Sequence, residues 1–139
     1  MAIKISKMKN KNVKTKEKFR DVEHALKTFE EYAVIQAKTY ETGNYRLGNK
    51  CHNLIMRALV YLYEMGCVNS LEPYLSHSEA GVRFEAAFAL LPFLGEKSES
   101  VLEDLAANSG GIMGINAHTC LSRWKSNEII FPYEDGWHW

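Results

Sequence analysis

The sequence lacks the features that would assign a function at once. It has no run of about 18 apolar residues, so it predicts no membrane span. No apolar stretch follows its basic N-terminus, which argues against a secretory signal. The patterns HExxH, GxSxG and CxxC and the glycine-rich phosphate loops are missing. We therefore expect a cytoplasmic protein that is not an enzyme and uses no cofactor.

Cysteine is also scarce, with only Cys51, Cys67 and Cys120 present. Their odd number and irregular spacing do not fit a metal site or a disulfide framework. The pairs Cys51–His52 and His118–Cys120 are one and two positions apart, and such neighbours face different directions on a helix. We expect reduced thiols, most of them buried, and no bound metal.

Charge is unevenly distributed, although the net charge is zero. Residues 1–20 hold eight basic residues and one acidic residue, whereas residues 21–139 hold nine basic and sixteen acidic residues. The chain is thus an acidic body with a basic arm. The arm has no aromatic residue before position 19, so it predicts no base stacking and only weak, salt-dependent contact with nucleic acid.

The pattern of apolar residues is that of an all-α protein. Spacing of i, i+3 and i+4 predicts helices over about 18–39 and 45–65. Gly43 is expected to end the first helix, Asn44 to cap the second, and Gly66 to follow its end. The short connection predicts an antiparallel helical hairpin.

The rest of the helical region repeats with a period of 30 residues. VRFEAAFALLPFL at 82–94 aligns with IMGINAHTCLSRW at 112–124, and the helix-forming segments LEPYL and VLEDL precede them. Ser78 is expected to cap the first long helix of the repeats, and Ser98 or Ser100 the short helix of the second pair. Paired helices at a fixed period predict a short α-solenoid of about six helices in antiparallel pairs. In this register Trp124 is buried and Ala87 lies where helices cross.

We divide the chain into a basic flexible arm at 1–16, a helical domain at 17–127 and an aromatic tail at 128–139. In the tail, IIFPYEDGWHW, five of eleven residues are Phe, Tyr, Trp or His. The tail is expected to fold back over the terminal apolar face of the solenoid, which needs a cap. Alternatively, Trp137 and Trp139 anchor a partner, because aromatic residues dominate interface hot spots.

LEPYLSHSEAGVRFEAAFALLPFL resembles a HEAT repeat, in which a Val-Arg pair, here Val82-Arg83, opens the second helix. With the closing pattern Asn116-Ala117, Leu121 and Trp124, residues 24–127 look like a bacterial family of small HEAT-like proteins of unknown function. Members of that family occur beside toxin genes, where small proteins often act as immunity proteins. The resemblance implies a fold and a protein partner, but no activity.

An acidic body would steer a basic partner, and nuclease toxins are commonly basic. The first hypothesis is therefore a protein-binding module that neutralises a cognate toxin. The alternatives are a nucleic-acid-binding or DNA-repair-related HEAT-like protein, and a structural subunit of a homo-oligomer. The candidate partner-binding residues are Glu72, Glu79, Glu85, Glu103, Asp104, Trp137 and Trp139.

Overall fold

The computed structural model describes residues 19–139, so the basic arm predicted at 1–16 lies outside the described residues. The described part of the chain is entirely helical, as predicted, and contains no strand. No helix in it is both long and apolar enough to cross a membrane. The elements are α2 (Val22–Thr42), α3 (Tyr45–Glu64), the 3-10 helix η1 (Val68–Ser76), α4 (Ala80–Leu94), α5 (Glu96–Asn108) and α6 (Gly111–Lys125).

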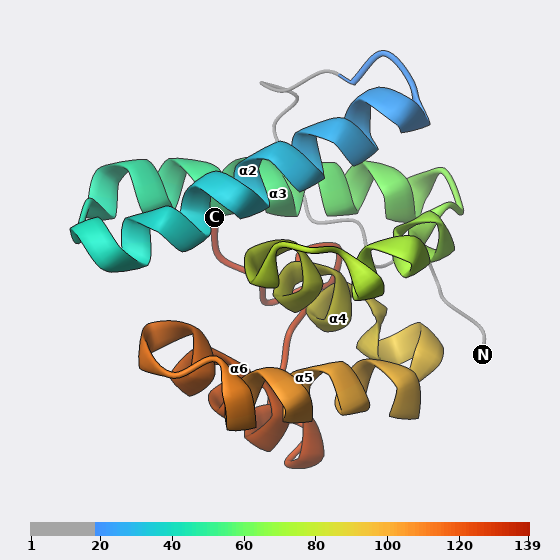
Figure 1. The fold of residues 1–139 in the computed structure, drawn as a ribbon. Coiled ribbons are helices and arrows are strands. Elements are labelled where there is room, and N and C mark those ends of the chain that lie inside the picture. The colour runs from blue at the N-terminus through green and yellow to red at the C-terminus, as the bar shows by residue number, and fades with distance from the viewer. Residues whose placement is uncertain (1–18) are drawn as a thin grey trace.

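Helices α2 and α3 lie side by side and are joined by the two-residue turn that the sequence predicts (Figure 1). Gly43 adopts the left-handed conformation at the end of α2, with φ of 71°. Asn44 caps α3, and its side chain accepts a hydrogen bond from the Leu47 N–H at 3.2 Å. Both predictions are confirmed. Phe29 from α2 and Leu59 from α3 are fully buried, so the apolar stripes of the two helices form one core.

Helix α4 lies at the centre of the molecule and contacts α2, η1, α5 and α6. It approaches α2 closely at Gly81, where an added Cβ would lie 2.7 Å from the Ala33 carbonyl oxygen. Its first turn has no side-chain cap, so the predicted cap at Ser78 is wrong. Instead, Arg83 Nη1 donates to the carbonyl oxygens of His77, at 2.6 Å, and Ser78, at 3.2 Å. Arg83 thus satisfies carbonyl groups of the turn that precedes α4.

Helix α5 begins earlier than the sequence predicts. It starts at Glu96, directly after Gly95, which has φ of 46°, so Ser98 lies inside the helix and is fully buried. The positive φ of Gly95 allows a sharp turn between α4 and α5, and no serine side chain caps the helix. Gly110, which lies between α5 and α6, and Gly111, the first residue of α6, also have positive φ.

The elements form three layers in Figure 1, with α2 and α3 at one side, α4 in the middle, and α5 and α6 at the other. The C-terminal tail runs back from α6 to the first hairpin (Figure 1). Phe131 and Tyr133 are buried, and the Tyr133 ring stacks on Tyr63 of α3 with 3.7 Å between centroids. Phe131 also contacts Phe88 of α4 and Trp124 of α6, so the tail folds back onto the helical domain and joins the two outer layers.

Trp124 is half-buried rather than buried, because α6 lies at the edge of the molecule. Its Nε1 donates to Glu99 Oε2 at 2.9 Å, and its ring meets Phe131 edge-on at 6.4 Å.

We expect Trp124→Ala to lower the free energy of unfolding by about 2 kcal/mol, less than for a fully buried ring. Trp124→Phe should cost only about 1 kcal/mol, since it removes the hydrogen bond and keeps most of the packing. Urea unfolding measures both. Equal losses in the two variants would mean that the hydrogen bond, not the ring, holds α6.

Candidate functional site

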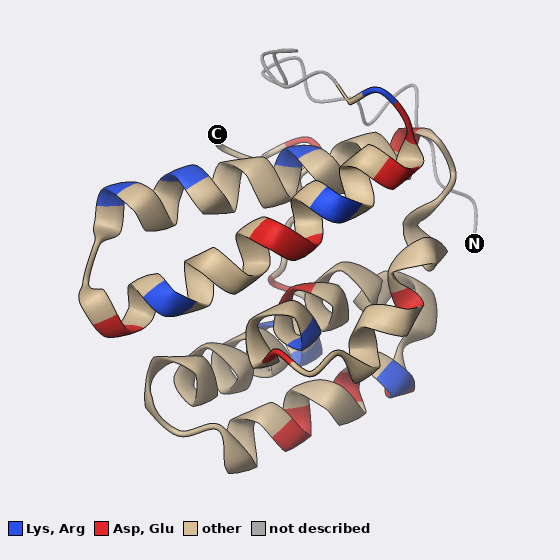
Figure 2. Ribbon diagram, turned by 45° about the horizontal axis from the view of Figure 1, so that its top comes forward, with Lys and Arg blue, Asp and Glu red and all other residues tan. Residues whose placement is uncertain are grey.

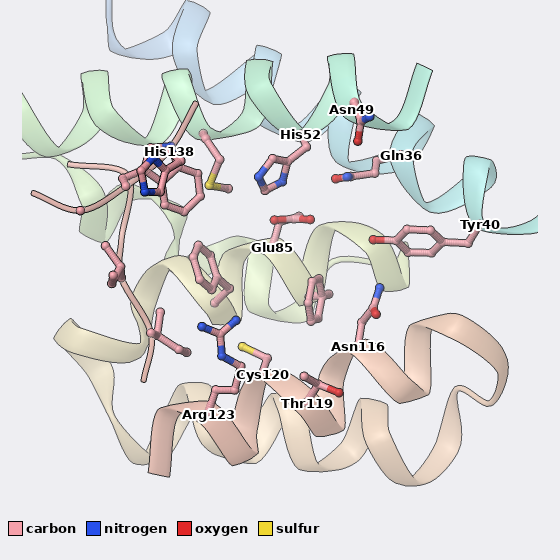
Figure 3. A pocket seen from close by; sticks show the side chains of 17 residues that line it. Gln36, Tyr40, Asn49, His52, Glu85, Asn116, Thr119, Cys120, Arg123 and His138 are labelled. Carbon is pink, nitrogen blue, oxygen red and sulfur yellow. The ribbon is translucent and has the colours of Figure 1, made fainter. Parts of the chain in front are cut away.

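A cavity of about 660 Å³ lies between the first hairpin, α4, α6 and the tail (Figure 3). Its wall mixes aromatic and apolar side chains with several polar groups that converge on its interior. That combination is typical of ligand-binding sites. The lining residues are Gln36, Tyr40, Asn49, His52, Met56, Phe84, Glu85, Phe88, Asn116, Thr119, Cys120, Arg123, Ile129, Ile130, Gly136, Trp137 and His138.

Helical spacing explains how each element contributes to this wall. Gln36 and Tyr40 are four residues apart on α2, and Asn116 and Cys120 are four apart on α6, so each pair faces the cavity together. The tail closes the remaining side with Trp137, whose ring stacks on His52 of α3 with 5.9 Å between centroids. The cavity thus depends on contacts between segments that are far apart in the sequence.

Glu85 of α4 is the central group of the cavity. Its side chain is only 6% exposed, and no ion pair or hydrogen bond joins its carboxyl group to another described residue. Figure 3 shows the carboxyl group pointing into the space between His52, Gln36 and Tyr40. Desolvation raises its pKa from 4.5 to about 8. Glu85 therefore lies in the cavity rather than on the outer surface, and its role as a partner-binding residue stays a prediction.

Gln36 of α2 supplies a second buried acceptor. Its Nε2 donates to the carbonyl oxygen of Gly48 at 3.3 Å, and its Oε1 has no hydrogen-bond partner. A carbonyl oxygen can only accept, so this contact fixes which end of the amide points toward Gly48. A buried acceptor without a partner is costly in a folded protein and needs a compensating donor, from water or from a ligand.

Tyr40, His52 and Cys120, three further titratable groups of the cavity, are neutral at pH 7. Burial and, to a smaller extent, Glu85 raise the pKa of Tyr40 to about 12, against the opposing effect of a hydrogen bond with Asn116. Burial lowers the pKa of His52. Burial, with a smaller effect of Glu85, raises the pKa of Cys120 to about 12. The Cys120 thiol is therefore not activated as a nucleophile, because the thiolate is the reactive form.

No three His, Cys, Asp or Glu side chains come together at metal-binding distance within residues 19–139. What the cavity can do chemically is accept hydrogen bonds, bind a positive charge and exchange one proton at Glu85 near neutral pH. A carboxyl group in that state can also act as a general acid or base.

The remaining acidic candidates lie on the outer surface of η1, the following turn and α5. Glu79, Glu103 and Asp104 are exposed, and Asp104 accepts a hydrogen bond from Asn108 at 2.8 Å. Glu72 is half-buried and pairs with Lys97, which joins η1 to the first turn of α5. Figure 2 shows acidic positions on α2, η1 and α5, whereas Lys and Arg line α3. We call Glu72, Glu79, Glu103 and Asp104 the acidic face.

Trp137 and Trp139 lie away from the acidic face, against α3. Both are half-buried, and their rings meet edge-on with 5.8 Å between centroids. The guanidinium of Arg57 lies over the Trp139 ring, 4.6 Å from its centroid, as in a cation–π contact. The structure therefore separates the two tryptophans from the acidic face, but it brings Trp137 and Glu85 together in the cavity lining.

The sequence pattern did not predict this cavity, and so it did not predict that Gln36, Tyr40, His52 and Asn116 come together.

Comparison with protein-family models, with curated proteins and with solved structures finds no match to this chain. The resemblance to a HEAT-like bacterial family therefore remains a prediction based on its residues.

Proposed function

We propose that this chain is a cytoplasmic, non-enzymatic protein-binding module with the architecture of a short HEAT-like α-solenoid of antiparallel helix pairs. More specifically, we propose that it is a bacterial immunity protein that neutralises a basic, nuclease-like toxin. The 30-residue repeat and the packing of η1 with α4 and of α5 with α6 support the solenoid. The acidic face is the observation that best supports a protein partner.

Three of the four side chains of the acidic face are exposed, and only Glu72 forms an ion pair with a described residue. Exposed acidic side chains raise the rate of encounter with a basic protein and add to the affinity for it. They repel the phosphates of nucleic acid, so the face favours a protein over a duplex.

Co-expression with the product of an adjacent gene, followed by purification, tests this function. We expect a basic protein to co-purify and its toxicity to be suppressed. If no protein co-purifies and no toxicity is suppressed, the proposal is refuted.

The double variant Glu103→Lys/Asp104→Lys should weaken the complex by about tenfold or more at low salt and by less at high salt, measured by isothermal titration calorimetry.

A matched control is Glu23→Lys/Glu31→Lys, which makes the same change in net charge at exposed positions of α2. We expect this control to retain most of the affinity. Equal losses in the two double variants would show that overall charge, rather than the acidic face, governs binding.

A further inference from the structure

The cavity is separate from the acidic face and has its own chemistry. Its two best-buried polar side chains, Glu85 from α4 and Gln36 from α2, are 6% and 9% exposed and come from facing helices. Gln36 Oε1 has no hydrogen-bond partner, and the Glu85 carboxyl group points into the cavity (Figure 3). These two side chains therefore offer acceptor oxygens to a ligand, in a wall that also holds the donor groups of Asn116 and Arg123.

The aromatic part of the wall fits the same kind of occupant. Phe84 and Phe88 of α4 are four residues apart and line the cavity together with Glu85, and the stacked pair His52–Trp137 lines it from α3 and the tail. Aromatic faces attract organic cations, and planar guanidinium groups also stack on them. A carboxylate within an aromatic wall is thus complementary to a cation that carries several N–H donors.

We propose that this cavity binds a guanidinium or ammonium group carried on an apolar stem, held by Glu85 and Gln36. The group can belong to a small free molecule or to an arginine or lysine side chain of a partner protein. The stem would lie against the aromatic wall while the charged head reaches the two buried oxygens. This proposal does not depend on the acidic face or on the immunity function.

The other ionisable groups around Glu85 do not oppose such a ligand. From α2 and α6, Tyr40 and Cys120 stay neutral because burial raises the pKa of each to about 12. From α3, His52 is neutral at pH 7 because burial lowers its pKa. Arg123 of α6 is the one cation among the lining residues, and its guanidinium already donates to the Glu128 carbonyl oxygen at 2.9 Å. His138 of the tail is exposed.

Binding and proton release are coupled at Glu85. The pKa of the free carboxyl group is about 8, and a bound cation lowers it, so binding below pH 8 releases a proton to the buffer. The apparent affinity should therefore rise up to about tenfold per pH unit between pH 6 and 8 and level off above pH 8. A neutral ligand would not show this dependence.

The experiment is calorimetric titration of the full chain with butylguanidine and with the peptide acetyl-Gly-Arg-Gly-amide, each at pH 6, 7, 8 and 9. The citrulline peptide is the neutral control for the second ligand. Binding of both cations, or of the peptide alone, supports a partner side chain as the source. Binding of butylguanidine alone supports a small molecule. If neither binds at millimolar concentration, or if the citrulline peptide binds equally, the proposal is overturned.

Glu85→Gln should reduce the affinity for the cation that binds by tenfold or more and remove its pH dependence. Glu31→Gln, at an exposed position of α2, removes the same charge and should leave both unchanged. Circular dichroism checks that each variant is folded. If Glu85→Gln does not fold, titration of the unmodified protein in two buffers of different ionisation enthalpy still decides, because the proposal requires proton release at pH 7 and none at pH 9. Affinity that persists in folded Glu85→Gln would overturn the proposal.

Discussion

Replacing Ala87 with glutamate should abolish stable folding of this protein. Ala87 lies at the centre of α4 with no exposed surface, and α4 contacts four other elements. The new carboxyl group would have no hydrogen-bond partner and would need space that the packed helices do not leave. Buried, unpaired polar groups and overpacking together account for the largest single-residue effects, of more than about 4 kcal/mol. That loss is a large part of the stability of a typical domain, about 5–15 kcal/mol.

Thermal unfolding followed by circular dichroism measures this effect. We expect Ala87→Glu to lower the melting temperature by more than about 12 °C or to leave no cooperative transition. Ala107→Glu is the matched control, since Ala107 is exposed on α5 and the same substitution there should change stability by less than about 0.5 kcal/mol. A melting temperature of Ala87→Glu within a few degrees of the parent would show that α4 does not pack as described.

The environment of Ala87 could be predicted because it follows from local spacing. The 30-residue repeat aligns Ala87 with Ala117, and both are fully buried. The same reasoning predicted the turn of the first hairpin, where Gly43 ends α2 and Asn44 caps α3. Helix periodicity and turn chemistry depend on near neighbours, so a sequence pattern reports them well.

The burial of Glu85 could also have been predicted from its position on α4. With Val82, Ala86 and Ala89, Glu85 occupies positions i, i+3, i+4 and i+7 of α4, and all four are buried. A single carboxylate in an otherwise apolar stripe was therefore a signal that could have been read from the sequence. Gln36 interrupts the apolar stripe of α2 in the same way. Such conflicts between pattern and residue type are expected at functional sites.

The cavity itself could not be predicted from local patterns. It exists because the tail turns back across the molecule, which brings Trp137 to His52, residues 85 positions apart in the chain. The half-burial of Trp124 has the same origin, since it depends on how α6 packs rather than on its register. Spacing along a helix says which side chains share a face, but not which distant segment covers that face.

Replacing Glu85 with glutamine should stabilise the protein at alkaline pH. The pKa of Glu85 is about 8 in the folded chain, against an ordinary value of 4.5. Between these values the folded state holds a proton that the unfolded state has lost, so the free energy of unfolding falls as pH rises. The fall reaches at most about 1.4 kcal/mol per pH unit and is complete above pH 8. Glutamine keeps the shape and hydrogen-bonding atoms of the protonated form but cannot ionise.

Urea unfolding of the parent and of Glu85→Gln at pH 5, 6.5 and 8.5 measures the difference. We expect it to be small at pH 5 and to grow to a few kcal/mol in favour of glutamine at pH 8.5. The lowered pKa of His52 destabilises both proteins below pH 6.5, so it cancels in the comparison. The pKa values of Cys120 and Tyr40 in the folded protein, about 12, lie above this pH range. Glu31→Gln, at an exposed position of α2, is the matched control for the loss of one carboxyl group. A constant difference between parent and Glu85→Gln across this range would mean that Glu85 titrates as it would in water, and the carboxyl group could not then be the buried centre of the cavity.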